Sequence, residues 1–290
     1  MEELKESKRS FSLSGILKHL HVSRSGYFDW LNRKPSEQQL KKEERKDKIM
    51  KIYDDSKQNY GAPKITIVMK KEGEVISERT VNSYMKEMNI KSQYVKNWIH
   101  PEKAKTVNEE LKNILNQQFN PDKPNAVWCT DITYIWTADD GWVYLSSIID
   151  LFSRRIIAWK LSKTMEVKFV LETIELAKLR RKVTEPCILH SDLGIHYTCR
   201  QYVEFTKDFI RSYSKKGYPY DNACIESFHS LIKREWLNRF IIINYEHAKS
   251  LVFEYIDTWY NTKRIHSHCG FKSPIDFEKE FESQKLLSAG

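Results

Sequence analysis

The sequence predicts an α/β protein in which an all-helical region precedes a mixed β-sheet. Three observations carry this prediction. Apolar residues recur at helical spacing in the N-terminal third, apolar and polar residues alternate from about Val127, and helical and extended stretches then follow one another to about residue 240. We therefore expect a helix-turn-helix-like region over 1–110, the α/β core over 120–240 and a helical extension over 241–290.

A first helical hairpin is expected over residues 12–20 and 23–32, with Ser23 as the N-cap of its second helix. The mixed-charge run 41–51 that follows it is typical of a solvated helix face. The inner face of the hairpin would carry Leu13, Ile16, Leu17, Tyr27 and Trp30.

A second hairpin has clearer boundaries. Residues 62–71 form an apolar helical face, Gly73 breaks that helix, and Ser77 can cap the next one. Because helical hairpins are common, a hairpin that only packs against protein is an equal alternative to one that binds DNA. The candidate DNA-binding residues on the exposed face are Arg79, Lys86 and Lys91, which lie among Glu78, Asn82 and Ser83.

The α/β part begins with the alternating stretch VWCTDITYIW, and residues 138–141 can form the hairpin turn after it. The stretches WVYLSSIIDLF and RRIIAWKLS are predicted as two further strands. A crossover helix, a short strand, a helix, a strand, a loop and a long helix follow, over 165–181, 187–192, 202–209, 210–214, 215–220 and 222–238. We expect the tryptophans of this part in the core, namely Trp128, Trp136, Trp142 and Trp159.

Composition narrows the class of protein. The 48 Lys and Arg residues exceed the 39 Asp and Glu residues, and the net charge of +9 favours a polyanionic partner without requiring one. The sequence shows no signal peptide and no apolar run of membrane-spanning length, and its five cysteines form no CxxC pair. We expect a soluble, cytoplasmic protein with reduced thiols and no contact with a membrane.

Three carboxylates stand at positions that suggest chemistry. Asp131 lies inside an apolar, aromatic strand, where an ionised carboxylate must be paired, hydrogen-bonded or bound to a cation. Asp192 stands where a buried strand ends, the edge at which open α/β sheets bind ligands. Glu226 lies one turn into the last long helix. Each acid alone could be a surface charge or a helix cap, but together they can converge on a hard divalent cation such as Mg²⁺ or Mn²⁺.

Four strings in chain order carry a resemblance to a known family: WCTDITYI, HSDLGIHYT, DNACIESFHSLIKRE and YNTKRIHSHCGFKSPIDF. They resemble successive signatures of bacterial insertion-sequence transposases encoded by two overlapping reading frames, specifically the second-frame product with its integrase core. The strings SRSGYFDWLNR and YGAPKITIVMKKEGEVISERTV resemble the helical region before that core. The resemblance spans residues from about 10 to 280.

This resemblance implies an RNase H-like fold in which Asp131, Asp192 and Glu226 are the DDE metal ligands. It implies a DNA transposase that cleaves and transfers strands at insertion-sequence ends with two Mg²⁺ or Mn²⁺ ions as cofactor. The implied partners are double-stranded DNA at the element ends and the target, further copies of the chain on that DNA, and the first-frame protein.

The resemblance and the helix geometry add candidate DNA contacts around the site. Lys233 follows Glu226 by seven residues, which returns it to the same helix face. It resembles the basic residue that contacts DNA ends beside the catalytic glutamate in integrases, and a solvated lysine paired with Glu235 or Glu226 is the alternative. Lys215 and Lys216 would belong to a mobile loop over the active site.

Three further candidates have open roles. Arg264 follows an amphipathic helix and would touch DNA or a partner subunit, or lie in a solvated tail. His190 would polarise a water or orient Asp192, or be an ordinary hydrogen-bonded histidine. Asn222 stands four residues before Glu226 and shares its helix face.

The spacing of the site departs from the family in one place. Between Asp192 and Glu226 lie 33 residues, slightly fewer than the family usually shows. We expect the shortening in the helix-to-strand connection around 208–214, with the site intact. Two other functions stay open at this point, a DNA-binding regulator with an inactive RNase H-like core and a nuclease acting on RNA–DNA hybrids. The three intact carboxylates favour an enzyme over the regulator. A nuclease of this kind would not explain the N-terminal hairpins or the string YNTKRIHSHCG.

Overall fold

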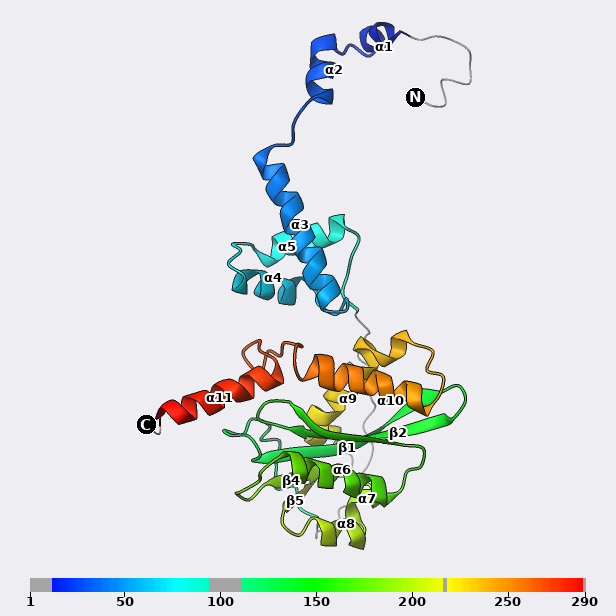
Figure 1. The fold of residues 1–290 in the computed structure, drawn as a ribbon, viewed down its shortest axis with the longest axis vertical. Coiled ribbons are helices and arrows are strands. Elements are labelled where there is room, and N and C mark those ends of the chain that lie inside the picture. Colours follow the sequence, from blue (N-terminus) through cyan, green and yellow to red (C-terminus); the bar gives the residue numbers. More distant parts are fainter. Residues whose placement is uncertain (1–11, 94–110, 216–217, 289–290) are drawn as a thin grey trace. The chain divides into compact units, whose positions relative to one another are not determined.

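Two units make up the chain, Met1–Lys91 and Ser92–Gly290 (Figure 1). The computed structural model describes residues 12–93, 111–215 and 218–288. Segment 241–290, expected as an extension, lies in the second unit. Within the described residues, no helix is both long and apolar enough to span a membrane.

The N-terminal hairpin consists of α1 (Leu13–His19) and α2 (Arg24–Leu31). Ser12 and Ser23 cap the two helices by accepting hydrogen bonds from the amides three residues later, which confirms the predicted cap. The predicted inner face is wrong in part, since Leu17 is buried but Trp30 is 68% exposed. Two helices of this length bury too little apolar surface between them to cover a tryptophan.

The second hairpin has the predicted form. α3 (Glu37–Asp55) packs against α4 (Ala62–Lys71) and α5 (Glu78–Glu87). Gly73 has a φ of +89°, a conformation that favours glycine and lets the chain turn after α4. Ser77 caps α5 by accepting a hydrogen bond from the Thr80 amide. The core of this three-helix group contains Ile49, Ile52, Ile65, Met69, Val81 and Met85.

A five-stranded mixed sheet in the order β3-β2-β1-β4-β5 forms the centre of the second unit. Its strands are β1 (Val127–Thr137), β2 (Gly141–Asp150), β3 (Ile156–Ser162), β4 (Ile188–Ser191) and β5 (Ile210–Tyr213). The first three strands are antiparallel, whereas β4 and β5 run parallel to β1. This topology is that of an RNase H-like sheet, so the predicted α/β class is confirmed.

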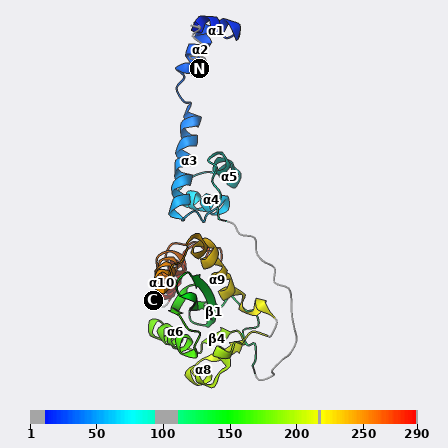
Figure 2. The ribbon, with the colours of Figure 1, turned by 90° about the vertical axis from the view of Figure 1, so that its right-hand side faces the viewer.

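Helices cover both faces of the sheet (Figures 1 and 2). On one face lie α6 (Val167–Arg180), α7 (Ile195–Thr198) and α8 (Arg200–Phe205), over a core that includes Trp128, Ile148 and Leu189. On the other lie α9 (Ala223–Glu235), which packs against β1 and β2, and α10 (Tyr245–Phe253). The turns η1 (Pro219–Asn222) and η2 (Leu237–Arg239) flank α9, and η3 (Glu254–Tyr260) continues α10 as a π-helix.

The tryptophans of the sheet do not all enter the core. Trp128 is fully buried, but Trp136 and Trp142 are 57% and 53% exposed, so this prediction is wrong for them. They pair across the turn end of the β1–β2 hairpin, where their rings pack edge to face with centres 5.1 Å apart. Alternation along a strand fixes the face on which a side chain lies, but not whether another layer covers it.

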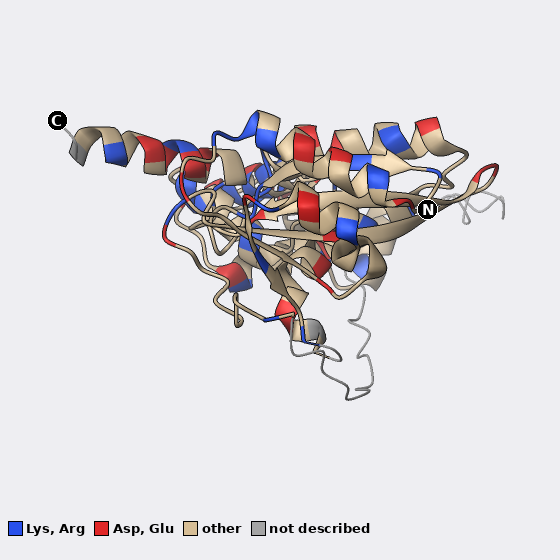
Figure 3. Cartoon of the chain, turned by 90° about the horizontal axis from the view of Figure 1, so that it is seen from below, with Lys and Arg blue, Asp and Glu red and all other residues tan. Residues whose placement is uncertain are grey.

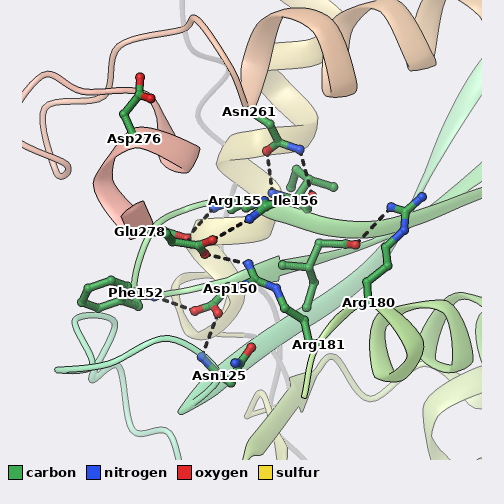
Figure 4. Close-up of polar contacts among 12 residues, drawn as sticks. Asn125, Asp150, Phe152, Arg155, Ile156, Arg180, Arg181, Asn261, Asp276 and Glu278 are labelled. Atoms are coloured by element: carbon green, nitrogen blue, oxygen red, sulfur yellow. Dashed lines mark hydrogen bonds and ion pairs between the residues drawn. The ribbon is translucent and has the colours of Figure 1, made fainter. Parts of the chain in front are cut away.

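The C-terminal helix α11 (Pro274–Ser288) is attached through a buried carboxylate (Figure 4). Glu278 accepts hydrogen bonds from Ser153, Arg155 and Arg181 at 2.6 to 2.7 Å. Burial raises the pKa of Glu278, but Arg181, Ser153 and Arg155 outweigh burial and hold this pKa below its ordinary value. Beside this group, Asp150 accepts hydrogen bonds from the Asn125 and Phe152 amides.

Candidate active site

One of the three predicted carboxylates stands on β1, and a second directly follows β4, the parallel strand beside it. In the pairing of β1 with β4, Val127 lies opposite Ile188 and Cys129 opposite His190. The same register, continued by two residues, sets Asp131 beside Asp192, which directly follows β4. The fold therefore brings together two acids that are 61 positions apart in the sequence, at the edge where such sheets bind ligands.

Asp192 is held by the turn that follows it. The Gly194 amide donates a hydrogen bond to its Oδ1 atom at 2.9 Å. A Cβ atom at position 194 would lie 2.9 Å from the same oxygen, so a larger residue there would displace the Asp192 carboxylate. Although the side chain reaches solvent, partial burial raises the pKa of Asp192, the Gly194 amide opposes this rise, and the charge of Asp131 adds to it. Such a pair of like charges favours binding of a cation.

Asp131 contacts groups from two other elements. Its Oδ1 atom accepts a hydrogen bond from the Ile132 amide at 2.8 Å, and its Oδ2 atom lies 3.4 Å from Nδ1 of His229 on α9. The Nε2 atom of His229 lies 2.7 Å from Oγ of Ser147, which is the cross-strand partner of Asp131 on β2. Asp131, Ser147 and His229 therefore meet at one point, on the face of the sheet that α9 covers.

Sequence reasoning gave His229 and Ser147 no role. A signal for His229 exists, because it lies three residues after Glu226 and hence on the same side of a helix. The partner of Asp131 on the next strand could be found only once the hairpin turn is placed to the residue. A one-residue error in that turn would assign Asp131 a different partner.

Glu226 is exposed, as Asp192 is, and lies in the first turn of α9. It lies one helical turn before His229, which contacts Asp131. In the described part of the chain, no group of three His, Cys, Asp or Glu side chains is close enough to hold a metal ion. The structure thus sets Asp131 on β1 and Asp192 directly after the neighbouring strand β4, with Glu226 on the helix that packs against β1.

The predicted basic residues near the site lie at different depths. Lys233 is half-buried on α9, and burial lowers its pKa while the charge of Asp131 opposes that fall. Its ammonium group is therefore within electrostatic reach of Asp131. Lys215 is exposed after β5, and its amide donates to the buried carboxylate of Asp221 at 2.8 Å. Lys216 lies outside the described residues.

The two supporting candidates are both buried. His190 has its ring nitrogens 2.9 and 3.1 Å from the hydroxyl oxygens of Ser212 and Ser214, and burial lowers its pKa to about 4. Of the two predicted roles, these contacts favour an ordinary hydrogen-bonded histidine over one that polarises a water or orients Asp192. Asn222 lies directly before α9 and is 3% exposed. Its side-chain oxygen has no hydrogen-bond partner among the described residues.

Arg264 is not the surface residue that the sequence predicts. Its side chain is buried, and its Nε and Nη2 atoms each donate to a carboxylate oxygen of Glu235 at 2.7 Å. The Tyr255 hydroxyl donates to the same carboxylate at 2.8 Å. The predictions of a DNA contact, a partner contact or a solvated tail are wrong for Arg264, because the buried charge of Glu235 takes up its guanidinium.

The DNA-binding candidates of the first unit are all exposed. Arg79 and Lys86 lie on the outer face of α5, and Lys91 follows three residues after Met88, at which the helix is capped. The backbone carbonyl of Lys91 accepts a hydrogen bond from the Tyr53 hydroxyl, which ties this segment to α3. All three basic side chains are therefore accessible to a polyanion.

The comparison with known proteins adds the decisive observation. A model of an HTH-like domain matches residues 39–98, and two models of an integrase core domain match residues 121–216 and 208–274. The transposase for insertion sequence element IS904 of Lactococcus lactis is 36% identical over 251 residues, which cover 86% of this chain and 99% of that protein. The chain belongs to the family of insertion-sequence transposases with an integrase core.

A second relative of this transposase is the InsF transposase for insertion sequence IS3A of Escherichia coli K12, with 32% identity over 96% of this chain and 97% of that protein. Among solved structures, the HTLV-2 integrase catalytic core domain in complex with magnesium covers 54% of the chain and 98% of its own, with 15% identity and a TM-score of 0.41. The family membership of the transposase confirms the predicted resemblance and its class, a DDE polynucleotidyl transferase.

Proposed function

We propose that the transposase cleaves DNA strands at insertion-sequence ends and transfers them to target DNA, using metal ions held by Asp131, Asp192 and Glu226. The family supports a divalent metal, and two Mg²⁺ or Mn²⁺ ions are the finer proposal. The observation that carries it is the β1–β4 register, which puts Asp131 beside Asp192.

The residues present fit a hard divalent cation. All three proposed ligands are carboxylates, the donor type that Mg²⁺ and Mn²⁺ prefer. Burial raises the pKa of Asp192 and the negative charge of Asp131 adds to the rise, so a cation shared by the two would relieve their repulsion. Bound there, the metal would activate the attacking hydroxyl and stabilise the leaving oxygen of the phosphodiester.

The chain itself orients the two aspartates. The Ile132 amide holds Oδ1 of Asp131, and the Gly194 amide holds Oδ1 of Asp192. Each carboxylate is thereby fixed through one oxygen by a neighbouring backbone group, with a limited set of rotations left. Glu226, from a separate element, would complete the ligand set on the side of α9.

DNA would be held by basic residues of both units. In the first unit these are Arg79, Lys86 and Lys91, and in the second unit Lys233 and Lys215. Both basic and acidic residues occur over the elements seen in Figure 3. We propose the DNA contacts as individual residues.

Assembly and location complete the proposal. Strand transfer joins two element ends to one target, which favours more than one copy of the chain on the DNA. The first-frame protein is a further candidate partner, proposed from the family resemblance alone. The site of action would be the cytoplasm, where the DNA substrate lies.

Incubation of the purified chain with candidate terminal inverted repeats and Mg²⁺, followed by mapping of the cut strands, tests the function. We expect cuts at the element ends that need the divalent metal, and joined products when target DNA is present. Binding of the ends without cleavage at any metal concentration would favour the DNA-binding regulator instead. Cleavage of RNA–DNA hybrids but not of the ends would favour the nuclease.

A further inference from the structure

His229 lies over a pair of residues that face each other on neighbouring strands. Asp131 on β1 and Ser147 on β2 are cross-strand partners, and the two ring nitrogens of His229 reach one residue each. Ser147 is fully buried and His229 is 6% exposed, so water has little access to this group. A histidine placed with both nitrogens on specific polar groups does more than fill space, because an apolar ring could fill it without a partner for either atom.

The chemistry of the three groups fixes the position of the ring proton. An ionised carboxylate only accepts hydrogen bonds, so a favourable contact with Asp131 requires the proton on Nδ1. In a neutral ring Nε2 is then the acceptor, and the Ser147 hydroxyl can donate to it across 2.7 Å. Ser147 thus selects the form of His229 that directs an N–H group at Asp131. At 3.4 Å, the Nδ1–Oδ2 distance is slightly longer than an ordinary N–H···O hydrogen bond, so the two groups are in close electrostatic contact.

We propose that His229 is a positioning residue of the transposase, which orients the Asp131 carboxylate for metal binding and is itself oriented by Ser147. This inference rests on the proposed function, in which Asp131 is a metal ligand. The Ile132 amide then binds one oxygen of Asp131 while His229 lies beside the other, and the two together would restrict rotation of the carboxylate. Groups that hydrogen-bond to a ligand in this way typically change metal affinity or activity by about 10-fold to 100-fold when removed.

The same contact gives α9 a fixed position beside the site. His229 and Glu226 lie on one helix, three residues apart, so the orientation of His229 on Asp131 also sets the side of α9 that carries Glu226. A mutation of His229 should therefore lower the affinity for the metal and the rate of cleavage. It should leave the affinity for DNA unchanged.

Two amide substitutions separate the two contacts of the ring. His229→Asn places an amide nitrogen near the position of Nδ1 and keeps a donor for Asp131, whereas His229→Gln reaches toward Ser147 and loses that donor. Ser147→Ala removes only the group that orients the ring. His247→Gln, at a half-buried histidine of α10, is the matched control for the exchange itself.

The experiment measures Mn²⁺ affinity by paramagnetic resonance titration, together with kcat and KM for cleavage of end DNA and the unfolding midpoint. We expect His229→Gln to lose about 10-fold to 100-fold in Mn²⁺ affinity and in kcat with KM unchanged, and His229→Asn to stay within a few-fold of wild type. Ser147→Ala should show a smaller loss of the same kind, and His247→Gln none.

Wild-type Mn²⁺ affinity and kcat in His229→Gln would overturn the inference, and so would equal losses in the Asn and Gln variants. Asp131→Asn distinguishes this failure from a failure of the proposed function. If Asp131→Asn is inactive while His229→Gln behaves as wild type, only the role of His229 is wrong. If Asp131→Asn itself binds Mn²⁺ and cleaves normally, the ligand assignment is wrong.

Discussion

The Nδ1 atom of His229 lies 3.4 Å from the Oδ2 atom of Asp131, and this contact joins α9 to β1 at the candidate site. Near the other end of α9, Glu235 is bound by Arg264 in a buried pair. The helix that carries Glu226 is therefore held at two points by polar groups of other elements. Several properties of the transposase should follow from this arrangement.

Removal of the buried pair at the end of α9 should destabilise the second unit strongly. Arg264→Ala removes the guanidinium and leaves the Tyr255 hydroxyl as the remaining donor of those described above to the buried Glu235 carboxylate. Loss of one partner of a buried ion pair typically lowers the free energy of unfolding by about 3–5 kcal/mol. Lys272→Ala, in an exposed pair with Glu280, is the control and should cost less than about 1 kcal/mol. Urea unfolding measures both. A loss below about 1 kcal/mol for Arg264→Ala would mean that the pair does not hold α9.

The buried Asp150, drawn with its neighbours in Figure 4, should make the stability of the transposase fall as the pH rises. Burial raises its pKa from 3.8 to about 6, although the Asn125 and Phe152 amides and Arg181 oppose the rise. Because the folded state binds this proton more tightly, the stabilising contribution is present below pH 3.8 and is lost as the pH rises through about 6. A shift of this size corresponds to roughly 3 kcal/mol.

The variant Asp150→Asn isolates this titration, because its side chain stays neutral at every pH. Relative to that of wild type, its free energy of unfolding should increase by up to roughly 3 kcal/mol between pH 4 and pH 8, because only wild type loses stability over this range. Urea unfolding of both proteins across this range gives the difference. A difference that does not change with pH would show that Asp150 does not titrate in this window.

The basic residues on the outer face of α5 should contribute to DNA binding through their charge and should not take part in catalysis. Arg79→Ala, Lys86→Ala and Lys91→Ala together should weaken DNA binding and flatten the dependence of log affinity on log salt by about 0.9 per lost phosphate contact. Mn²⁺ affinity should not change. The double variant Lys41→Ala, Lys51→Ala removes exposed charges from α3 and should leave the slope nearly unchanged. An unchanged slope in the α5 variant would indicate that this face packs against protein.

Lys233 should bind the phosphate backbone close to the scissile bond. It shares a helix face with Glu226 and lies within electrostatic reach of Asp131. Of its two predicted alternative partners, Glu235 and Glu226, the first is bound by Arg264. Lys233→Ala should raise the DNA concentration for half-maximal cleavage by about tenfold, as for the loss of one charged hydrogen bond. Lys233→Arg should restore most of it. Wild-type binding and cleavage by the alanine variant at physiological salt would exclude this role.

The sequence predicts those features that depend on local spacing. The cap at Ser77, the break at Gly73 and the strand that carries Asp131 each follow from a few neighbouring residues, and the structure has all three. The succession of strands and helices in the second unit also follows from local patterns, whereas the strand order comes from the structure. The family membership rests on motifs that span most of the chain.

What the sequence does not predict depends on partners that are distant along the chain. The burial of Arg264 depends on Glu235, which lies 29 positions earlier. The contact of His229 with Ser147 spans 82 positions and needs the exact hairpin register as well as the placement of α9. The exposure of Trp136 is missed because a period of two gives the face of a strand without saying how far the next layer extends.

Strand cleavage by Asp131→Asn, Asp192→Asn and Glu226→Gln tests the central claim most directly. Each exchange keeps the shape of the side chain and removes one ligand charge, so cleavage and joining of end DNA with Mg²⁺ should fall below detection in all three. The free energy of unfolding should stay within about 1 kcal/mol of wild type or rise, because the exchange relieves crowded negative charge. Asp139→Asn, at an exposed position of the hairpin turn, should cleave as wild type does. A cleavage rate near that of wild type in any of the three variants would contradict the assignment of that residue as a metal ligand.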